Sequence, residues 1–380
     1  MYVSGRGTEG YGTIFPAIIE WKRKGNNLDD VYMIGKNGVH SHQAFEKVKS
    51  LQKISGVNIN IEAYPNKDQI DPEAYVKILK AIEQPACAIV AVPDHLHYEV
   101  TKNCLESGFH TLVMKPLTPT TKEANELIKI ADEKKLYGAV EFHKRWDKQN
   151  LMLRDNLMNG RIGEPLYCWV EYSQRKIIPE EIFREWIENT NPLQYLGVHY
   201  LDIVSFATGA KPVRVMAVGQ KNWLTKKGIN VYDSIQCIVE WKIENGNIFS
   251  QTLLVNWIDP ENTTAMSDQK IKFVGTKGRF NSDQKDRGIE IISDSENIEV
   301  PNPDFCRPYG TEKITWRGYG IESITNFLCD AFEITNNKIT PSDLEGFRPT
   351  FKEALVSTTI LELASKSLQD EGKWYSIKDL

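Results

Sequence analysis

Two segments far apart in the chain carry residues whose types and spacing could bind a dinucleotide and move a proton. Residues 5–10 read G-R-G-T-E-G, a G-x-G-x-x-G spacing typical of a loop whose backbone approaches a pyrophosphate at the start of a helix. Lys115 ends a short buried run, at the edge where open α/β sheets hold their ligands. A dinucleotide beside a positioned lysine indicates hydride transfer, with the lysine handling the proton. The loop residues expected to contact the cofactor are Gly5, Arg6, Gly7, Gly10, Tyr11 and Gly12.

The end of the second predicted strand bears on the choice of dinucleotide. A carboxylate usually lies there and binds the ribose hydroxyl of NAD. Here the strand ends in Gly35-Lys36-Asn37, while Asp29 and Asp30 lie at its opposite end. Because no carboxylate lies there to repel it, a 2′-phosphate could bind, attracted by Lys36 and Arg6. The alternative is that Lys36 is a solvated turn residue. The sequence therefore favours NADP over NAD and leaves both open.

A histidine later in the chain is expected on a helix that faces the same site. The pair Asn191-Pro192 is typical of a helix start, and Gly209 of a helix end. On that helix Tyr195, His199 and Asp202 fall at i, i+4 and i+7 and share one stripe. A polar stripe of this kind suits a cleft between domains. A core histidine bonded to Asp202 is the structural alternative.

The first 140 residues alternate short apolar runs with helical patterns. This rhythm predicts a Rossmann-type α/β domain over residues 1–142, with a doubly wound parallel sheet covered on both faces. A short first strand is expected at 2–4, before the glycine loop. The other predicted strands cover 31–35, 58–63, 87–92, 111–114 and 136–140, and the predicted helices cover 15–24, 42–51, 72–82, 96–107 and 121–134.

After residue 142 the apolar runs become longer, alternating and rich in aromatic residues. They predict an α+β domain over 143–380, built on a large, mostly antiparallel sheet with one open face. In the run 235–242, Ile235, Cys237, Val239 and Trp241 would share the packed face, and Asn245-Gly246 indicates a hairpin. Helices at 323–334 and 349–367 are expected to flank this sheet. Its strands are expected at 166–174, 213–220, 235–243, 248–257, 270–274 and 289–292.

The open face and the composition bear on partners and location. Ile and Trp residues on an open sheet face predict a homodimer, or a dimer of dimers, formed through that sheet.

A net charge of -5 argues against a nucleic-acid partner, and the longest apolar run is too short to span a membrane. With no signal-like start, the chain is expected to be cytoplasmic, with six reduced and buried cysteines. No spacing of His, Cys, Asp or Glu predicts a metal site.

Several motifs in a fixed order resemble those of the glucose–fructose oxidoreductase / inositol dehydrogenase / rhizopine-catabolism (Gfo/Idh/MocA) family. That family carries T-P-N-x-x-H, then E-K-P at the next strand end, then G-x-H-x-x-D on a helix. This chain has V-P-D-H-L-H at 92–97, M-K-P at 114–116 and G-V-H-Y-L-D at 197–202, with G-T-K-G at 275–278 near the far end of the sheet. The resemblance covers essentially the whole chain. It adds Val92, Pro93, His97 and Met114 to the expected cofactor contacts, beside Lys36 and Lys115.

The resemblance also assigns roles at the predicted reaction centre. Lys115 would be the general acid/base, and His199 and Tyr195 would bind and polarise the reacting oxygen. Two positions depart from the family pattern, because Met114 replaces a Glu and Tyr195 replaces an Asp. Tyrosine can donate a hydrogen bond but carries no negative charge at neutral pH. The expected substrate contacts are Arg184, Trp186, Tyr195, His199, Asp202 and Trp257.

Together these features predict an NAD(P)-dependent oxidoreductase acting on a secondary alcohol or carbonyl of a sugar, cyclitol or sugar derivative. A second hypothesis is an enzyme that keeps its cofactor tightly bound and recycles it. Such an enzyme would be an epimerase, lyase or hydrolase that works through a transient ketone. A third reading is a non-catalytic NAD(P)-binding sensor, supported by the departures at Met114 and Tyr195.

Overall fold

The computed structural model describes residues 3, 10–295 and 298–379 of the 380-residue chain. The predicted strand at 2–4 and the predicted cofactor contacts Gly5, Arg6 and Gly7 lie, apart from Val3, outside these residues. Gly10 is the first loop residue that the structure describes, and it is exposed.

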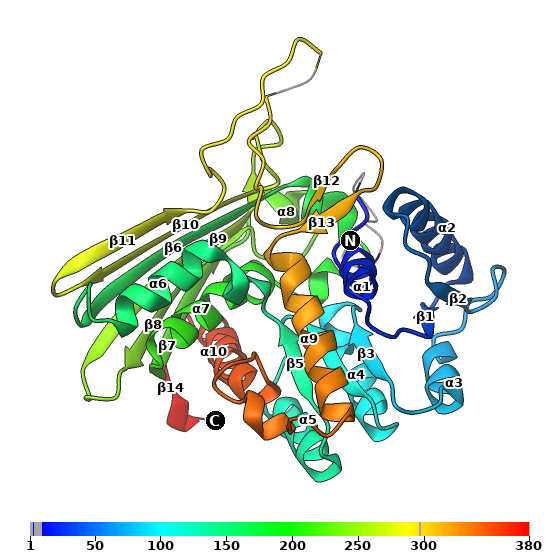
Figure 1. Ribbon diagram of the computed structural model, residues 1–380. Helices are drawn as coiled ribbons and strands as arrows, with labels where there is room; N and C mark the ends of the chain where they lie inside the picture. The colour runs from blue at the N-terminus through cyan, green and yellow to red at the C-terminus, as the bar shows by residue number, and fades with distance from the viewer. Residues whose placement is uncertain (1–2, 4–9, 296–297, 380) are drawn as a thin grey trace.

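The N-terminal half consists of parallel strands alternating with helices (Figure 1). Among the described residues, β1 and β2 form one parallel pair, and β3, β4 and β5 form a second parallel sheet. This arrangement confirms the predicted Rossmann-like domain. The elements are α1 (Ile14–Arg23), β1 (Asp30–Ile34), α2 (Gly38–Ser55), β2 (Asn60–Tyr64), α3 (Ala74–Ala81), β3 (Cys87–Val90), α4 (His97–Glu106), β4 (His110–Met114), α5 (Thr121–Lys134) and β5 (Gly138–Glu141).

The strand register sets the edge at which the site is built. Val90 pairs with Val113, and Met114 pairs with Glu141, so β3, β4 and β5 end side by side. Lys115 directly follows β4 and therefore lies beside the end of β5. Parallel strands buried on both faces are apolar along their length, so a polar residue at their carboxyl ends stands out.

The C-terminal half is dominated by a seven-stranded sheet with the order β11-β10-β6-β9-β8-β7-β14. Neighbouring strands are antiparallel except for β6 and β9, which confirms the mostly antiparallel sheet that the sequence predicts. The strands are β6 (Pro165–Arg175), β7 (Lys211–Gln220), β8 (Ser234–Lys242), β9 (Ile248–Asp259), β10 (Ser267–Gly275), β11 (Gly278–Asp283) and β14 (Tyr375–Ser376).

One face of this sheet is packed and the other is open, as the alternation in β8 predicts. Ile235, Cys237, Val239 and Trp241 are fully buried, whereas the residues between them are half-buried or exposed. The turn between β8 and β9 contains Gly246 at φ 94°, a backbone conformation that glycine adopts without strain. The hairpin predicted there is confirmed.

Helices cover the packed face and join the two halves (Figure 1). The remaining elements are α6 (Lys148–Met158), α7 (Val198–Thr208), α8 (Trp223–Lys226), β12 (Arg307–Tyr309), β13 (Thr315–Arg317), α9 (Tyr319–Thr335) and α10 (Phe351–Gln369). Helix α10 packs against β7, α7 and also α5 and β5. Gly138 in β5 allows this close approach, since a Cβ there would lie 2.4 Å from the Phe351 ring.

Helix α9 does not flank the large sheet, so the expectation for 323–334 is wrong. It packs against α1 and β5 in the core of the N-terminal half, where Phe327 stacks on Tyr137 at 5.4 Å. The amphipathic pattern of the helix reveals a buried face but not which sheet covers it. The chain thus returns to the N-terminal half after the large sheet is complete.

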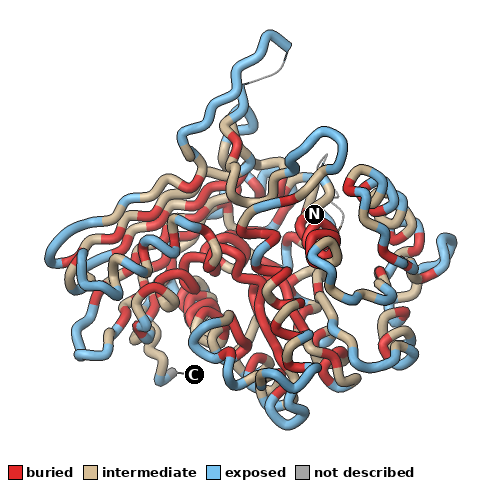
Figure 2. The backbone as a smooth tube through the Cα atoms, viewed as in Figure 1, coloured by how far each residue is buried: buried red, intermediate tan, exposed pale blue. Residues whose placement is uncertain are grey.

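The segment 289–292 is not a strand, which corrects a second expectation. It lies in a projecting excursion between β11 and β12 that Figure 2 shows as mostly exposed, with a single bridge between Ile291 and Glu299. The cysteines also differ from expectation, because Cys87 is exposed, and Cys306 and Cys329 are only half-buried. None of the helices within the described ranges combines the length and apolar character that a membrane span needs.

Candidate active site

Lys115 is buried at the carboxyl end of β4, with 3% of its surface exposed. Its Nζ donates a hydrogen bond of 2.5 Å to the carbonyl oxygen of Tyr195 and lies 3.3 Å from the centre of the Tyr195 ring. Burial lowers the pKa of Lys115 to about 8, against the opposing charges of Asp94 and Glu141. A lysine with such a pKa can exchange a proton near neutral pH.

His97 holds the loops that follow β3 and β4 together. Its Nδ1 lies 2.6 Å from the carbonyl oxygen of Pro116, and its Nε2 lies 3.0 Å from the carbonyl oxygen of Val92. Burial lowers the pKa of His97. Both ring nitrogens thus face backbone carbonyl oxygens, and the predicted cofactor contact of His97 stays a prediction. His97 positions the segment that carries Lys115.

The helix predicted to start at Asn191 is present in a modified form. Asn191 Oδ1 accepts a hydrogen bond from the Gln194 backbone N–H at 2.9 Å, as expected for a cap. A π-helical turn at Leu193–Gly197 precedes α7, which ends at Gly209 with φ 66°. The wider turn falls where Tyr195 reaches Lys115, and such turns are frequent at functional sites.

His199 lies in the first turn of α7 and is 3% exposed. Burial lowers its pKa well below the usual value, and His143, Lys115 and Lys144 lower it further. The imidazole is therefore neutral at neutral pH. Its Nδ1 is buried, and no described residue hydrogen-bonds it. Lys115, Tyr195 and His199 thus lie close together, as predicted.

A second histidine packs directly against the first. The rings of His143 and His199 have centroids 4.7 Å apart, and His143 also stacks on Tyr319 at 5.6 Å. His143 Nδ1 lies 2.7 Å from a carboxylate oxygen of Glu141, at the end of β5. The other oxygen of Glu141 accepts a hydrogen bond of 2.7 Å from Ser323 Oγ in α9.

Asp202, which the helical stripe predicts to face the site, is held by Arg145. Arg145 donates to both oxygens of Asp202, at 2.6 to 3.1 Å, and both side chains are buried. The alternative of a core bond between His199 and Asp202 is wrong, because Arg145 is the partner.

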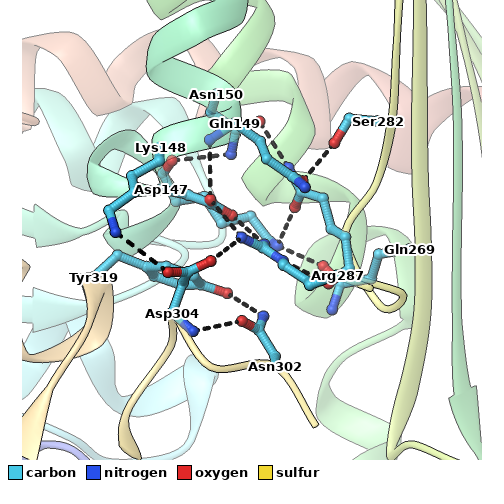
Figure 3. Close-up of polar contacts among 12 residues, drawn as sticks. Asp147, Lys148, Gln149, Asn150, Gln269, Ser282, Arg287, Asn302, Asp304 and Tyr319 are labelled. Atoms are coloured by element: carbon cyan, nitrogen blue, oxygen red, sulfur yellow. Dashed lines mark hydrogen bonds and ion pairs between the residues drawn. The ribbon is translucent and has the colours of Figure 1, made fainter. Parts of the chain in front are cut away.

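A second buried lysine lies behind the histidine pair. Lys144 Nζ donates to Gln284 at 2.9 Å and also to Gln269, and burial lowers its pKa to about 7. Figure 3 shows the neighbouring polar network around Asp147 and Arg287, which joins α6, β10 and the segment after β11. Arg287 is central, since it bonds Asp147 at 2.6 Å and also Asp304. The network anchors the segment between β11 and β12 to α6 beside the site.

The other expected substrate contacts fall into two groups. Trp186 is half-buried and packs against Tyr195, and Arg184 is exposed nearby, with a hydrogen bond of 3.2 Å to the Gly228 carbonyl. Trp257 is fully buried and packs 6.0 Å from Tyr195 on the sheet side, so it supports the site instead of facing a substrate.

The described residues at the start of α1 fit an anionic cofactor group. No acidic residue lies in the first turn of α1, and the buried Thr13 Oγ1 has no hydrogen-bond partner among the described residues. Lys47 adds a positive charge, because its Nζ bonds the Gly10 carbonyl at 2.8 Å. These features favour a pyrophosphate. Gly12 has φ 72°, while Tyr11 packs on Trp316 and its hydroxyl lies 3.2 Å from Ser50 Oγ.

The remaining expected cofactor contacts are spread along the strand ends. Lys36 is exposed just after β1, while Val92 and Pro93 are half-buried after β3. The Met114 side chain packs in the core of the N-terminal half, so it is not a contact through its side chain. Of these predicted cofactor contacts, Lys115 places its Nζ in the site, beside the Tyr195 carbonyl oxygen.

Sequence reasoning missed several buried polar residues of the site. Five consecutive residues from Glu141 to Arg145 follow a buried strand, and four of them are titratable. The rule that singles out Lys115, a polar residue at the carboxyl end of a parallel strand, applies equally to them. Asp94 was also missed, although it follows β3 and accepts hydrogen bonds from Thr190 and Gln194.

Comparisons with family models cover most of the chain. Residues 10–142 match the oxidoreductase family with an NAD-binding Rossmann fold, and residues 151–281 match the Gfo/Idh/MocA C-terminal domain. The two matches follow one another in the order that the structure shows.

Curated relatives are similar over part of their length. The chain is 28% identical to the NADP-linked scyllo-inositol 2-dehydrogenase of Bacillus subtilis, over 44% of this chain and 48% of that protein. It is 29% identical to the D-glucoside 3-dehydrogenase of Escherichia coli, over 38% of this chain and 40% of that protein. The chain thus spans half or less of the length of these relatives.

Solved structures share the whole fold. The NAD+ complex of an inositol dehydrogenase homolog from Azotobacter vinelandii has a TM-score of 0.65 at 15% identity, covering 92% of this chain and 97% of that one. The scyllo-inositol dehydrogenase of Lactobacillus casei with NAD(H) and scyllo-inositol has a TM-score of 0.62 at 13% identity, covering 93% and 100%. From the two family matches and this shared architecture, the chain belongs to the Gfo/Idh/MocA family of oxidoreductases.

Proposed function

We propose that this protein is an NAD(P)-dependent oxidoreductase that acts on a secondary alcohol or carbonyl of a sugar, a cyclitol or a related compound. The family and the names of its relatives support this reaction class. The observation that carries the proposal is the buried Lys115, whose pKa of about 8 suits proton exchange near neutral pH.

The bound nicotinamide supplies the hydride acceptor or donor. When an alcohol is oxidised, the neutral amine of Lys115 takes the hydroxyl proton and becomes an ammonium. The Tyr195 ring and carbonyl oxygen, both in contact with Nζ, then stabilise that positive charge. In the reverse direction the ammonium returns the proton to the oxygen.

His199 is proposed to bind the reacting oxygen. A neutral imidazole carries one N–H and one acceptor nitrogen, so it can hydrogen-bond an alcohol or a carbonyl without adding charge. The low pKa of His199 keeps it in this form. Trp186 and Arg184, at the rim beside Tyr195, are proposed to contact more distant parts of the substrate.

A turnover screen tests this function. Purified protein is mixed with NAD or NADP and with pools of sugars, cyclitols and sugar derivatives, and cofactor reduction is followed by absorbance. Lys115→Met should lose at least about 10²-fold in turnover while still binding cofactor, because only the proton transfer is removed. Lys129→Met, at an exposed lysine, is the matched control. Cofactor binding without reduction by any pool would contradict the proposal.

We further propose that NADP is the preferred cofactor. No carboxylate ends β1, and the exposed Lys36 follows it directly. The NADP-linked relative from Bacillus supports this choice, whereas the neighbouring structures contain NAD. Lys36→Glu should lower the ratio of kcat/KM for NADP to that for NAD by about tenfold, the effect of about 1.4 kcal/mol. An unchanged ratio would argue against a role for Lys36.

We also propose a homodimer formed through the open face of the large sheet. Trp169 in β6 lies on this face, between Thr252 of β9 and Lys272 of β10. Exposed Tyr167 and Ile248 extend the apolar area of this face toward one end of the sheet. Sedimentation at micromolar concentration should give a dimer, and Trp169→Glu a monomer. A wild-type monomer would refute the interface.

A further inference from the structure

The centre of the site collects several groups that can carry positive charge. Lys115, His143 and Lys144 all lie near enough to lower the pKa of His199. The stripe of α7 contributes no free carboxylate, because position 195 is a tyrosine and Asp202 is bonded twice to Arg145. Buried cations without a counter-charge are costly, so the nearby carboxylates matter.

Two buried carboxylates act on Lys115, and they have different partners. Asp94 and Glu141 both oppose the loss of its proton. Asp94 is engaged by Thr190 Oγ1 at 2.7 Å and by Gln194 Nε2 at 3.3 Å. These contacts hold the segment before α7. They do not connect Asp94 to the histidines.

Glu141, in contrast, is bonded directly to the histidine that touches His199. Its two oxygens are fixed by His143 Nδ1 and by Ser323 Oγ, each at 2.7 Å. The β4–β5 register places its backbone opposite Met114, the residue before Lys115. Glu141 is therefore close to both members of the proposed catalytic pair. It lies beside Lys115 at the strand ends, and it is connected to His199 through His143.

We infer that Glu141 and His143 form a positioning dyad for the reaction of Lys115 and His199, with Glu141 supplying from β5 the negative charge that α7 lacks. Glu141 orients the His143 ring by accepting from its Nδ1, as carboxylates do for functional histidines. His143 in turn packs on His199 and fixes its orientation. This inference rests on the proposed function and extends it to residues outside the Lys115, Tyr195 and His199 set.

The surroundings of the dyad limit what else could supply this charge. His143 faces Tyr319 of α9, Phe305 of the excursion and His199 of α7, in addition to Glu141. None of these neighbours carries a negative charge at neutral pH. Lys115 faces Asp94, Glu141, His97, His199 and the Tyr195 ring. Glu141 is the carboxylate common to both environments.

The first test is the pH dependence of alcohol oxidation in Glu141→Gln. Loss of the charge lowers the pKa of Lys115 below about 8, so the rise of kcat/KM with pH should move to lower pH. Turnover should fall by about tenfold or more, the scale seen for outer partners of functional groups. Glu141→Asp should restore the position of the rise. Glu126→Gln, at a surface ion pair, is the matched control.

A second measurement needs no turnover. Nuclear magnetic resonance of 15N-histidine can follow the chain's seven histidines individually. Glu141→Gln should remove the hydrogen-bonded Nδ1–H signal of His143 and shift the His199 signals, and His143→Gln should raise the pKa of His199. Circular dichroism confirms that each variant is folded.

The two measurements separate failure of the dyad from failure of the proposed function. An unmoved pH rise in Glu141→Gln, together with unchanged His199 signals, would overturn the dyad even if the wild type is a dehydrogenase. Absence of turnover in the wild type would refute the proposed function, and the histidine signals would still decide whether Glu141 orients His143 beside His199.

Discussion

Lys115→Met should change the pH dependence of stability in a way that can be worked from the structure. Lowering the pKa of the buried lysine from 10.5 to about 8 corresponds to roughly 3 kcal/mol. Between these two pH values the unfolded chain binds one proton more than the folded chain. The free energy of unfolding of the wild type therefore rises with pH across this window.

The methionine variant has no group that titrates at this position. The free energy of unfolding of the wild type, minus that of the variant, should therefore increase by roughly 3 kcal/mol from pH 8 to 10.5. Any constant loss, such as the hydrogen bond of 2.5 Å to the Tyr195 carbonyl, cancels in this comparison. Urea unfolding followed by circular dichroism at several pH values measures it, with Lys129→Met as control. A difference that stays constant from pH 8 to 10.5 would refute the argument that burial lowers the pKa of Lys115.

Three further predictions concern the supports of the site. Arg145→Met leaves Asp202 buried without its partner and should lower the free energy of unfolding in urea by about 3–5 kcal/mol. Adding Asp202→Asn to this variant should recover part of the loss. Equal stability of the single and the double variant would contradict the pairing. Because the pKa of His199 is well below 6.5 in the folded state, stability should fall as pH drops below about 6.5, and less so in His199→Asn. Gly138→Ala places a Cβ 2.4 Å from the Phe351 ring and should cost about 1–3 kcal/mol, measured as a lower Tm.

Local patterns predicted most of the fold because the two halves differ in their periodicity. The apolar runs of β3, β4 and β5 are typical of buried parallel strands, and the alternation in β8 is typical of a half-open sheet. The packing of α9 could not be predicted in this way. An amphipathic helix must bury one face, but the pattern does not say which distant segment covers it.

The reaction centre was predicted to the extent that it lies on strand ends and helix stripes. Lys115 and His199 were found by position and spacing, and the structure brings Lys115 into contact with Tyr195 and near enough to His199 to lower its pKa. The bond between Asp202 and Arg145 was not predicted, because Arg145 comes from a segment 57 residues away. The strand-end rule that found Lys115 also applies to Glu141, but the sequence does not show that its side chain bonds the histidine two positions later.

The proposed reaction depends most on Lys115 as the group that exchanges the proton. The direct measurement is alcohol oxidation as a function of pH in the wild type and in Lys115→Arg, with cofactor binding checked separately. The wild-type kcat/KM should rise with pH and level off above about 8, while arginine, which stays charged, should give at least about 10²-fold lower turnover at every pH. An arginine variant with the wild-type rate and the same pH curve would contradict the central role of Lys115.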